Sequence, residues 1–180
     1  MRVTASMTTI DELLEESGRT FADEAGITMK DEPAPLFRLL VLSVLLSRRV
    51  QAKLGTRACR ELVDAGYGTP ERLRDASWED VVGTLGRARY TGTEQTTTAL
   101  QEGAGRVVDE WGGDLRRMRR AADGDVDTLR GHLTAFPRLG PVGADIFVRE
   151  VQAVWPEYRP HFDGKALAAA EALGLPHDAG

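Results

Sequence analysis

The chain has 180 residues, of which 42% are hydrophobic and 28% charged, proportions typical of a globular protein that builds its core without disulfide bonds. Its single cysteine, Cys59, excludes an internal disulfide, a cysteine-based zinc site and an iron–sulfur cluster. The longest apolar run, residues 39–46, is too short to span a bilayer, and acidic residues stand where a signal peptide would need an apolar stretch. We therefore expect a cytoplasmic protein that does not contact membranes.

The net charge of −5 is distributed unevenly. Residues 1–35 contain three basic and eight acidic side chains, whereas residues 36–180 contain 20 of each. This asymmetry predicts an acidic N-terminal helix and linker over residues 1–35 and a neutral body over residues 36–180. The whole chain has no basic signature of nucleic-acid binding, so any surface for DNA must be local.

Helical patterns dominate the chain, and the sustained apolar–polar alternation of strands is scarce. Five apolar residues near the N-terminus fall on one helical face, opposite acidic residues: Ile10, Leu13, Leu14, Phe21 and Ala25. Pro33 and Pro35 are expected to break the chain after this helix. Residues 36–46 are apolar nearly all round, which predicts a central buried helix.

Caps and stop signals predict the helices that follow. Gly66 ends an amphipathic helix that begins at residue 52, and Thr69 precedes a proline at the next helix start. Ser77 resembles the first residue of a capping box, and either Asp125 or Asp127 caps a helix through residue 133. Further helices are expected over residues 93–111, 114–122, 141–154 and 164–173. The pattern as a whole predicts an all-α fold of about ten short helices.

The most informative stretch, residues 133–147, reads LTAFPRLGPVGADIF. It combines the end of one helix, a tight turn at residues 136–140 and a new helix that starts at Pro141. Gly140 can adopt a positive φ and lets another backbone come close, and the first amides of the new helix form an anion site. This geometry suits a DNA phosphate, although on shape alone an ordinary corner between two helices is the better interpretation.

Two further blocks accompany this turn. Residues 37–47 read FRLLVLSVLLS, and Asp163 is followed ten residues later by Leu173-Gly174-Leu175. In this order, the three blocks resemble those of the helix-hairpin-helix DNA glycosylase superfamily, which includes endonuclease III. The turn of that family reads Leu-Pro-Gly-Val-Gly, corresponding to residues 136–140 here, and its catalytic aspartate follows about twenty residues later. The resemblance covers about residues 36–176.

The resemblance implies a two-lobed all-α fold in which the hairpin, residues 136–143, grips the DNA backbone. It also implies hydrolysis of the bond between a damaged or mismatched base and its sugar, after the base has rotated out of the duplex. Asp163 would be the catalytic carboxylate, which stabilises the positive charge that builds on the sugar and orients a water. Asp163 can also be interpreted as the N-cap of a helix that starts at Gly164, and both roles can hold together.

The resemblance also suggests which other residues contact DNA. The expected backbone contacts are Arg138, Leu139, Gly140, Val142 and Gly143 in the hairpin, and Arg48, Arg49, Lys53 and Arg57 after the buried helix. Within the second group, Arg48 or Arg49 would act as the wedge. A base pocket lined by Trp155, Tyr158 and Phe162 would hold the flipped base by stacking, although packing in the core or a loop is an equally good interpretation.

Several departures from the family refine the prediction. Val142 stands where bifunctional members carry a nucleophilic lysine, which implies excision without strand cleavage. Arg138 replaces the first glycine of the hairpin, and the C-terminal cysteines of the iron–sulfur subgroup are missing. The three histidines have no metal-ligand spacing, so we expect no metal and no cofactor. The basic run at residues 116–120 fits a solvated helix face better than a phosphate site.

The preferred prediction is a monomeric, monofunctional DNA glycosylase that binds duplex DNA and associates with the nucleoid in the cytoplasm. One alternative is a non-catalytic DNA-binding or lesion-sensing protein on the same fold. Another is a helical interaction module unrelated to DNA. Excision separates the first of these from the second, and binding without excision separates the second from the third.

Overall fold

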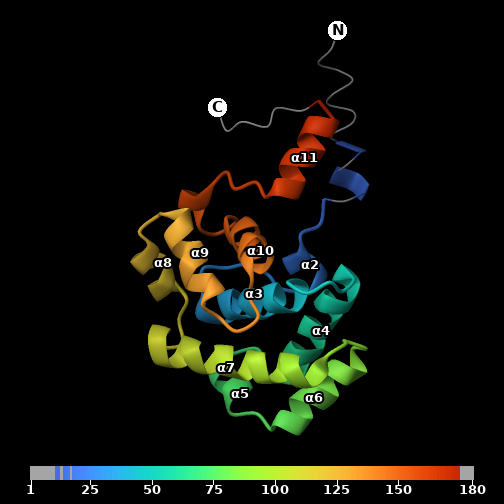
Figure 1. Cartoon of the computed structure of the whole chain (residues 1–180), viewed down its shortest axis with the longest axis vertical. Helices are drawn as coiled ribbons and strands as arrows, with labels where there is room; N and C mark the ends of the chain where they lie inside the picture. The colour runs from blue at the N-terminus through green and yellow to red at the C-terminus, as the bar shows by residue number, and fades with distance from the viewer. Residues whose placement is uncertain (1–10, 13, 17, 175–180) are drawn as a thin grey trace.

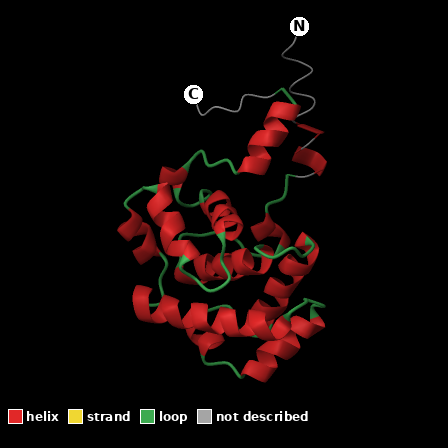
Figure 2. Cartoon of the chain, in the orientation of Figure 1, coloured by secondary structure: helices red, strands yellow, loops and turns green. Residues whose placement is uncertain are grey.

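The computed structural model of the chain describes residues 11–174, except residues 13 and 17. Every regular element in this part of the chain is a helix (Figure 2). The prediction of an all-α fold is therefore confirmed for the described residues. The expectations made for Ile10, Leu13 and Leu175 fall outside them.

The central helix of the fold is α3, and several of the others pack against it (Figure 1). The elements in chain order are α2 (Phe21–Glu24), α3 (Pro33–Leu46), α4 (Ala52–Asp64), α5 (Pro70–Arg74), α6 (Trp78–Arg87), α7 (Thr93–Trp111), α8 (Arg116–Ala122), α9 (Val126–Thr134), α10 (Pro141–Val151), the short 3-10 helix η1 (Pro156–Tyr158) and α11 (Gly164–Ala172). α4, α7 and α10 pack against α3, while α5 and α6 pack against α7. α11 projects from the rest of the molecule, at the top of the view (Figure 1).

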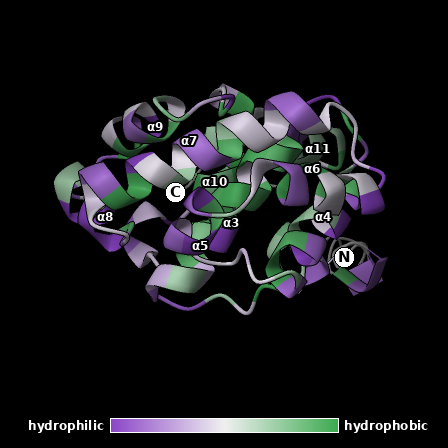
Figure 3. Cartoon of the chain, turned by 90° about the horizontal axis from the view of Figure 1, so that it is seen from below, coloured by the Kyte–Doolittle hydropathy of each residue, from purple (hydrophilic) through white to green (hydrophobic). Residues whose placement is uncertain are grey.

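The burial of α3 confirms the prediction of a central apolar helix. Leu36, Leu39, Leu42 and Leu45 are fully buried, and only three of its 14 residues escape burial. A helix that is apolar all round needs partners on several sides, which explains why other helices surround it. Figure 3 shows hydrophobic residues concentrated along α3 and α10, with hydrophilic residues on the outer helices.

The expectation that Pro33 and Pro35 break the chain is wrong. Pro33 is the first residue of α3, and Pro35 lies within its first turn. Proline is tolerated there because the amide that it lacks would have no partner within the helix. The boundary drawn between residues 35 and 36 consequently falls inside α3.

A single apolar face over the N-terminal segment is also not observed. The side chain of Leu14 is 61% exposed, whereas Ala22 and Ala25 are buried. Thr20 starts a new helix, because its hydroxyl accepts from the amide of Asp23 at 3.1 Å while the Asp23 carboxylate accepts from the amide of Thr20 at 3.4 Å. This capping box interrupts the periodicity that the sequence suggested.

Helix boundaries elsewhere agree closely with the predictions, with one correction. α7 spans the expected residues 93–111 and ends at Gly112, whose φ is +60°. Asp125, and not Asp127, caps α9 by accepting from the amide of Thr128 at 2.8 Å. α10 ends at Val151 and not at residue 154, because the chain turns there and buries Trp155 completely.

None of the helices in the described segments has the length and apolarity that a bilayer crossing requires.

Candidate functional site

The hairpin between α9 and α10 turns at Arg138, not at Gly140. Arg138 has a φ of +61°, whereas Gly140 is extended, with φ −80° and ψ −176°. The expectation that Gly140 supplies the positive φ is therefore wrong. A non-glycine residue in the left-handed region costs roughly 1–2 kcal/mol, and Arg138 takes the place of the first glycine in the family's hairpin motif. The backbone thus has the conformation that suits a glycine, at the position where the resemblance expects one.

Two predicted contact residues of the hairpin are buried against α3. Leu139 is only 2% exposed. A Cβ built on Gly143 would lie 2.6 Å from Leu139 Cδ1, 2.9 Å from Ser47 Cβ and 3.1 Å from the carbonyl oxygen of Ser43. The Ser47 hydroxyl also donates to the carbonyl oxygen of Arg138 at 2.8 Å. Leu139 and Gly143 thus seat the hairpin on α3, and both residues are buried there.

The first turn of α10 faces outward. Gly140 is its N-cap and Pro141 its first residue, and no side chain caps the helix. No atom of the described residues lies within 4 Å of a Cβ built on Gly140, and Val142 is 58% exposed. Helix N-termini of this kind attract anions, because their first amides lack partners and the helix dipole is positive there.

Two other helices begin close to the hairpin, also without a side-chain cap. α4 starts after Gln51 and α7 after Gly92. Arg48 joins the turn before α4 to the start of α7, by donating to the carbonyl oxygen of Thr91 at 3.3 Å and to Thr96 Oγ1 at 3.2 Å. Arg138 joins the hairpin to α7, since it donates to Gln95 Oε1 at 3.3 Å. The positive ends of three helices therefore meet on one side of the molecule.

Four of the predicted DNA contacts belong to the hairpin or to the segment that leads into α4, and together they define what we call the hairpin face: Arg48, Arg49, Lys53 and Arg138. Arg49, Lys53 and Arg138 are exposed, and Arg48 is half-buried. No carboxylate of the described residues lies within 4.0 Å of any of the four cations. Among the described residues these four cations therefore form no ion pair, which leaves them available to a phosphate backbone.

Tyr90 supports this face from within. Its hydroxyl donates to the carbonyl oxygen of Leu45 at 2.7 Å, and its ring is buried. Burial raises the pKa of Tyr90, while the charges of Arg48 and Arg138 act in the opposite direction. Tyr90 therefore packs in the core and ties the segment before α7 to the end of α3.

Asp163 caps α11, as one of its two interpretations expected. Its Oδ1 accepts from the amide of Ala166 at 2.8 Å, and its Oδ2 accepts from Arg149 Nη1 at 2.7 Å. Burial alone would raise the pKa of this carboxyl, but the Ala166 amide and the Arg149 guanidinium outweigh it and hold the pKa below its usual value. The side chain is therefore a half-buried carboxylate whose contacts favour the ionised form.

The three aromatic residues proposed for a base pocket do not line a common pocket, because two are buried and one is exposed. Trp155 is fully buried, with its ring centroid 5.9 Å from that of Phe147 and 6.1 Å from that of Tyr158. Its indole nitrogen donates to Asp31 Oδ1 at 2.9 Å. Tyr158 is 5% exposed, whereas Phe162 is 50% exposed. Trp155 and Tyr158 thus pack in the core, and only Phe162 has a face available for stacking.

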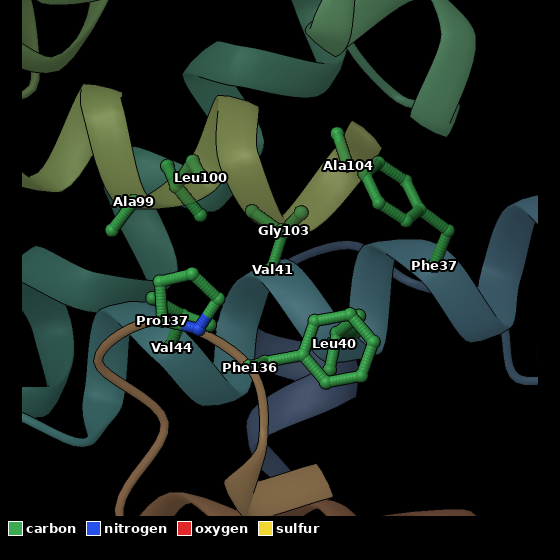
Figure 4. A pocket seen from close by; sticks show the side chains of 10 residues that line it. All are labelled: Phe37, Leu40, Val41, Val44, Ala99, Leu100, Gly103, Ala104, Phe136 and Pro137. Carbon is green, nitrogen blue, oxygen red and sulfur yellow. The ribbon is translucent and has the colours of Figure 1, made fainter. Parts of the chain in front are cut away.

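Two depressions in the described part of the chain are relevant to ligand binding, and neither is lined by Asp163. The first is a cavity of about 10 Å³ under the hairpin, closed by Phe136 and Pro137 (Figure 4). Only apolar residues line it, and it is far too small for a base. The second, of about 370 Å³, is an open depression beside α8 and η1 that includes Arg119, Arg120 and Glu157.

The basic run on α8 is partly neutralised by acidic side chains. Arg116 pairs with Asp114 at 2.8 Å, and Arg119 pairs with Asp31 at 2.8 Å and with Glu157. These contacts connect α8 to neighbouring segments and favour a structural role over phosphate binding. Within the described residues, no group of three His, Cys, Asp or Glu side chains gathers as potential metal ligands.

Arg149 was not singled out from the sequence, although it contacts Asp163 directly. It lies in the last turn of α10, 14 residues before Asp163. Nothing local in the sequence marks this arginine, because its partner comes close only after the chain has passed through η1 and the loop that follows.

A scan against protein-family models found no match, and a search of curated proteins found no relative.

Proposed function

We propose that this protein binds duplex DNA through the hairpin face and hydrolyses the N-glycosidic bond of a damaged or mismatched base. The fold would be the two-lobed fold of the helix-hairpin-helix glycosylases, and Asp163 would be its catalytic carboxylate. The substrate is a base that has rotated out of the helix, since the bond is inaccessible inside a duplex.

The hairpin carries this proposal. A residue at positive φ, a helix N-terminus without a side-chain cap, and Gly140 follow one another within a few residues. They lie on a face whose four cations form no ion pair with a described carboxylate. An ordinary corner between helices explains the turn but not this accumulation of positive charge. A single phosphate beside Gly140 would accept from the first amides of α10 and lie close to the charge of Arg138.

The chemistry would require a carboxylate that is negative at neutral pH, and the contacts of Asp163 favour that state. The bond between the sugar carbon and the base nitrogen breaks, and the carboxylate stabilises the positive charge that develops on the sugar. The oxygen of a water then bonds to the sugar carbon, and the proton that this water loses goes to the departed base. Val142 carries no amine, so no Schiff base would form at this position and the abasic product would keep its backbone intact.

A second candidate is a DNA-binding or lesion-sensing protein without excision. One specific observation favours it: the charge of Asp163 is already paired with Arg149, and the neighbouring Trp155 and Tyr158 are buried. In this case the hairpin face would bind DNA, while Asp163 would serve only as the cap of α11.

One experiment separates the candidates. The protein is incubated with a panel of duplexes that each carry one lesion or mismatch, then treated with alkali to cut at abasic sites. Binding is measured in parallel by fluorescence anisotropy. Asp163→Asn keeps the shape and the cap but removes the charge, so we expect normal folding, unchanged or tighter binding and a loss of excision by roughly 10²–10³-fold.

Binding without excision by the parent protein would establish the second candidate. The absence of duplex binding at low salt, including binding to abasic-site DNA, would rule out both.

A further inference from the structure

Arg149 joins three separate parts of the chain. Its Nη1 pairs with Asp163 at the start of α11 at 2.7 Å, and its Nη2 approaches Glu150 Oε1 at 3.4 Å. Its guanidinium carbon lies 5.1 Å from the centroid of the Phe21 ring on α2. The guanidinium plane is therefore held on one side by an aromatic ring and at its ends by two carboxylates.

Glu150 also contacts Arg149, but it forms the longer of the two ion pairs and has other hydrogen-bond partners. This buried carboxylate accepts from the amides of Phe21 at 3.4 Å and Ala22 at 3.0 Å, so it already has two partners at the start of α2. Arg149 lies closer to Asp163 than to Glu150, since the two ion pairs measure 2.7 Å and 3.4 Å. The contacts of Arg149 thus orient it toward Asp163.

The two oxygens of Asp163 then have different roles. Oδ1 is engaged by the helix amide of Ala166, and Oδ2 by Arg149. Together these contacts determine the rotamer of the carboxylate. If only the hydrogen bond to Oδ1 remained, the carboxylate could rotate about its side-chain torsions and would spend less time in any one orientation.

We propose that Arg149 is the positioning residue for Asp163, fixing the orientation of the carboxylate and holding it ionised. This inference rests on the proposed excision activity, in which a misplaced or protonated carboxylate would lose its effect. Arg149 acts through Asp163 and does not itself contact the substrate.

Few other charged groups bear on the ionisation of Asp163. Among the described contacts, Arg149 is the cation that faces it from another element, and Glu150 stands behind Arg149. Its own helix contributes the amides of Ala166 and Lys165. Removing Arg149 leaves burial opposed only by these amides, so the pKa of Asp163 should rise.

The test compares Arg149→Gln, Arg149→Lys and a matched control in single-turnover excision from pH 4 to 9. The control is Arg116→Gln, because Arg116 also pairs with an aspartate at 2.8 Å and its side chain is 38% exposed, against 31% for Arg149. Carbon-detected NMR of the aspartate carboxyls follows the titration of Asp163 in each protein. Urea denaturation establishes that each variant is folded.

We expect Arg149→Gln to lower the excision rate at pH 7 by on the order of 10- to 100-fold and to move the acidic limb of the profile to higher pH. Arg149→Lys should restore the acidic limb of the profile, because the positive charge returns. The rate should recover only partly, because an ammonium group lacks the planar arrangement of donors that a guanidinium has. Arg116→Gln should change neither.

Excision by Arg149→Gln that equals or exceeds the parental rate would overturn the inference, as would an unmoved titration of Asp163. If Arg149→Gln does not fold, a fully parental rate for Arg149→Lys overturns the orientation argument. A parent protein that excises nothing contradicts the proposed function instead, and the NMR titration then still decides whether Arg149 controls the ionisation of Asp163.

Discussion

Two glycines of the hairpin, three residues apart, should respond in opposite ways to the same substitution. In Gly143→Ala, the new methyl group would lie 2.9 Å from Ser47 Cβ and 3.1 Å from the carbonyl oxygen of Ser43. Neither atom is the far end of a flexible side chain, so α10 must move away from α3. Overpacking of this kind costs about 2–3 kcal/mol, from which the better helix propensity of alanine recovers about 1 kcal/mol.

The net expectation for Gly143→Ala is therefore a loss of about 1–2 kcal/mol in the free energy of unfolding, measured by urea denaturation. Gly140→Ala is the matched control. Its φ of −80° suits alanine, and no described atom lies within 4 Å of the new Cβ. Alanine is less favourable than glycine at an N-cap, but it also lowers the entropy of the unfolded chain, so stability should stay within about 0.5 kcal/mol of the parent.

DNA binding should separate the two variants a second time. If a phosphate approaches the backbone at Gly140, the alanine methyl group weakens duplex binding although the fold is unharmed. Equal destabilisation by both substitutions would refute the described packing of Gly143 on α3. Parental affinity in Gly140→Ala would refute the close approach of a phosphate at that residue.

Three further predictions concern charge. The affinity for duplex DNA should fall with salt concentration, with a slope of roughly two to four released counterions. Replacing Arg48 and Arg49 with alanine should reduce both the affinity and the slope in anisotropy titrations at several salt concentrations. An unchanged slope would exclude the hairpin face as the DNA-binding surface. Borohydride should trap no covalent adduct with abasic DNA, because Val142 offers no amine. Lys165 is the lysine nearest to Asp163 in the sequence, so an efficient adduct that survives its mutation would contradict this prediction. The lowered pKa of Asp163 means that its contribution to stability is complete above its unfolded value of about 4 and is lost as pH falls through the lower folded value. Asp163→Asn should therefore lose less stability than the parent between about pH 5 and 2 in urea denaturation, and equal losses would show that the carboxylate gains nothing from its partners.

Local signals in the sequence predicted most of the helices. Apolar residues on every side of α3 required burial, and the glycines after residue 111 stopped α7 where expected, because both effects act within one helix or one turn. Asp125 could not be separated from Asp127 by sequence, since both suit an N-cap and the choice depends on where the preceding turn ends. Thr20 was missed because a short capping box was hidden within a longer apolar periodicity.

The candidate site was less accessible to sequence reasoning. The sequence predicted the turn at the right residues, but the positive φ occurs at Arg138. The geometry of the turn requires a left-handed residue at this position, and arginine adopts that conformation at an energetic cost. Trp155 was ambiguous, since an aromatic residue before a loop serves a core or a pocket equally well. The pair between Arg149 and Asp163 depends on how η1 and the loop that follows fold back, which no local pattern encodes.

The carboxylate of Glu150 has a consequence for where this chain can be cut. The carboxylate is buried and binds the amide of Ala22, which lies 128 residues earlier in the chain, so this contact joins α2 to α10. A chain shortened to begin after α2 would leave this acid without its two amide donors, and with Arg149 as its one remaining partner among those described. The smallest fragment that folds on its own should therefore include Phe21 and Ala22, and their amides should exchange with deuterium as slowly as those of the core.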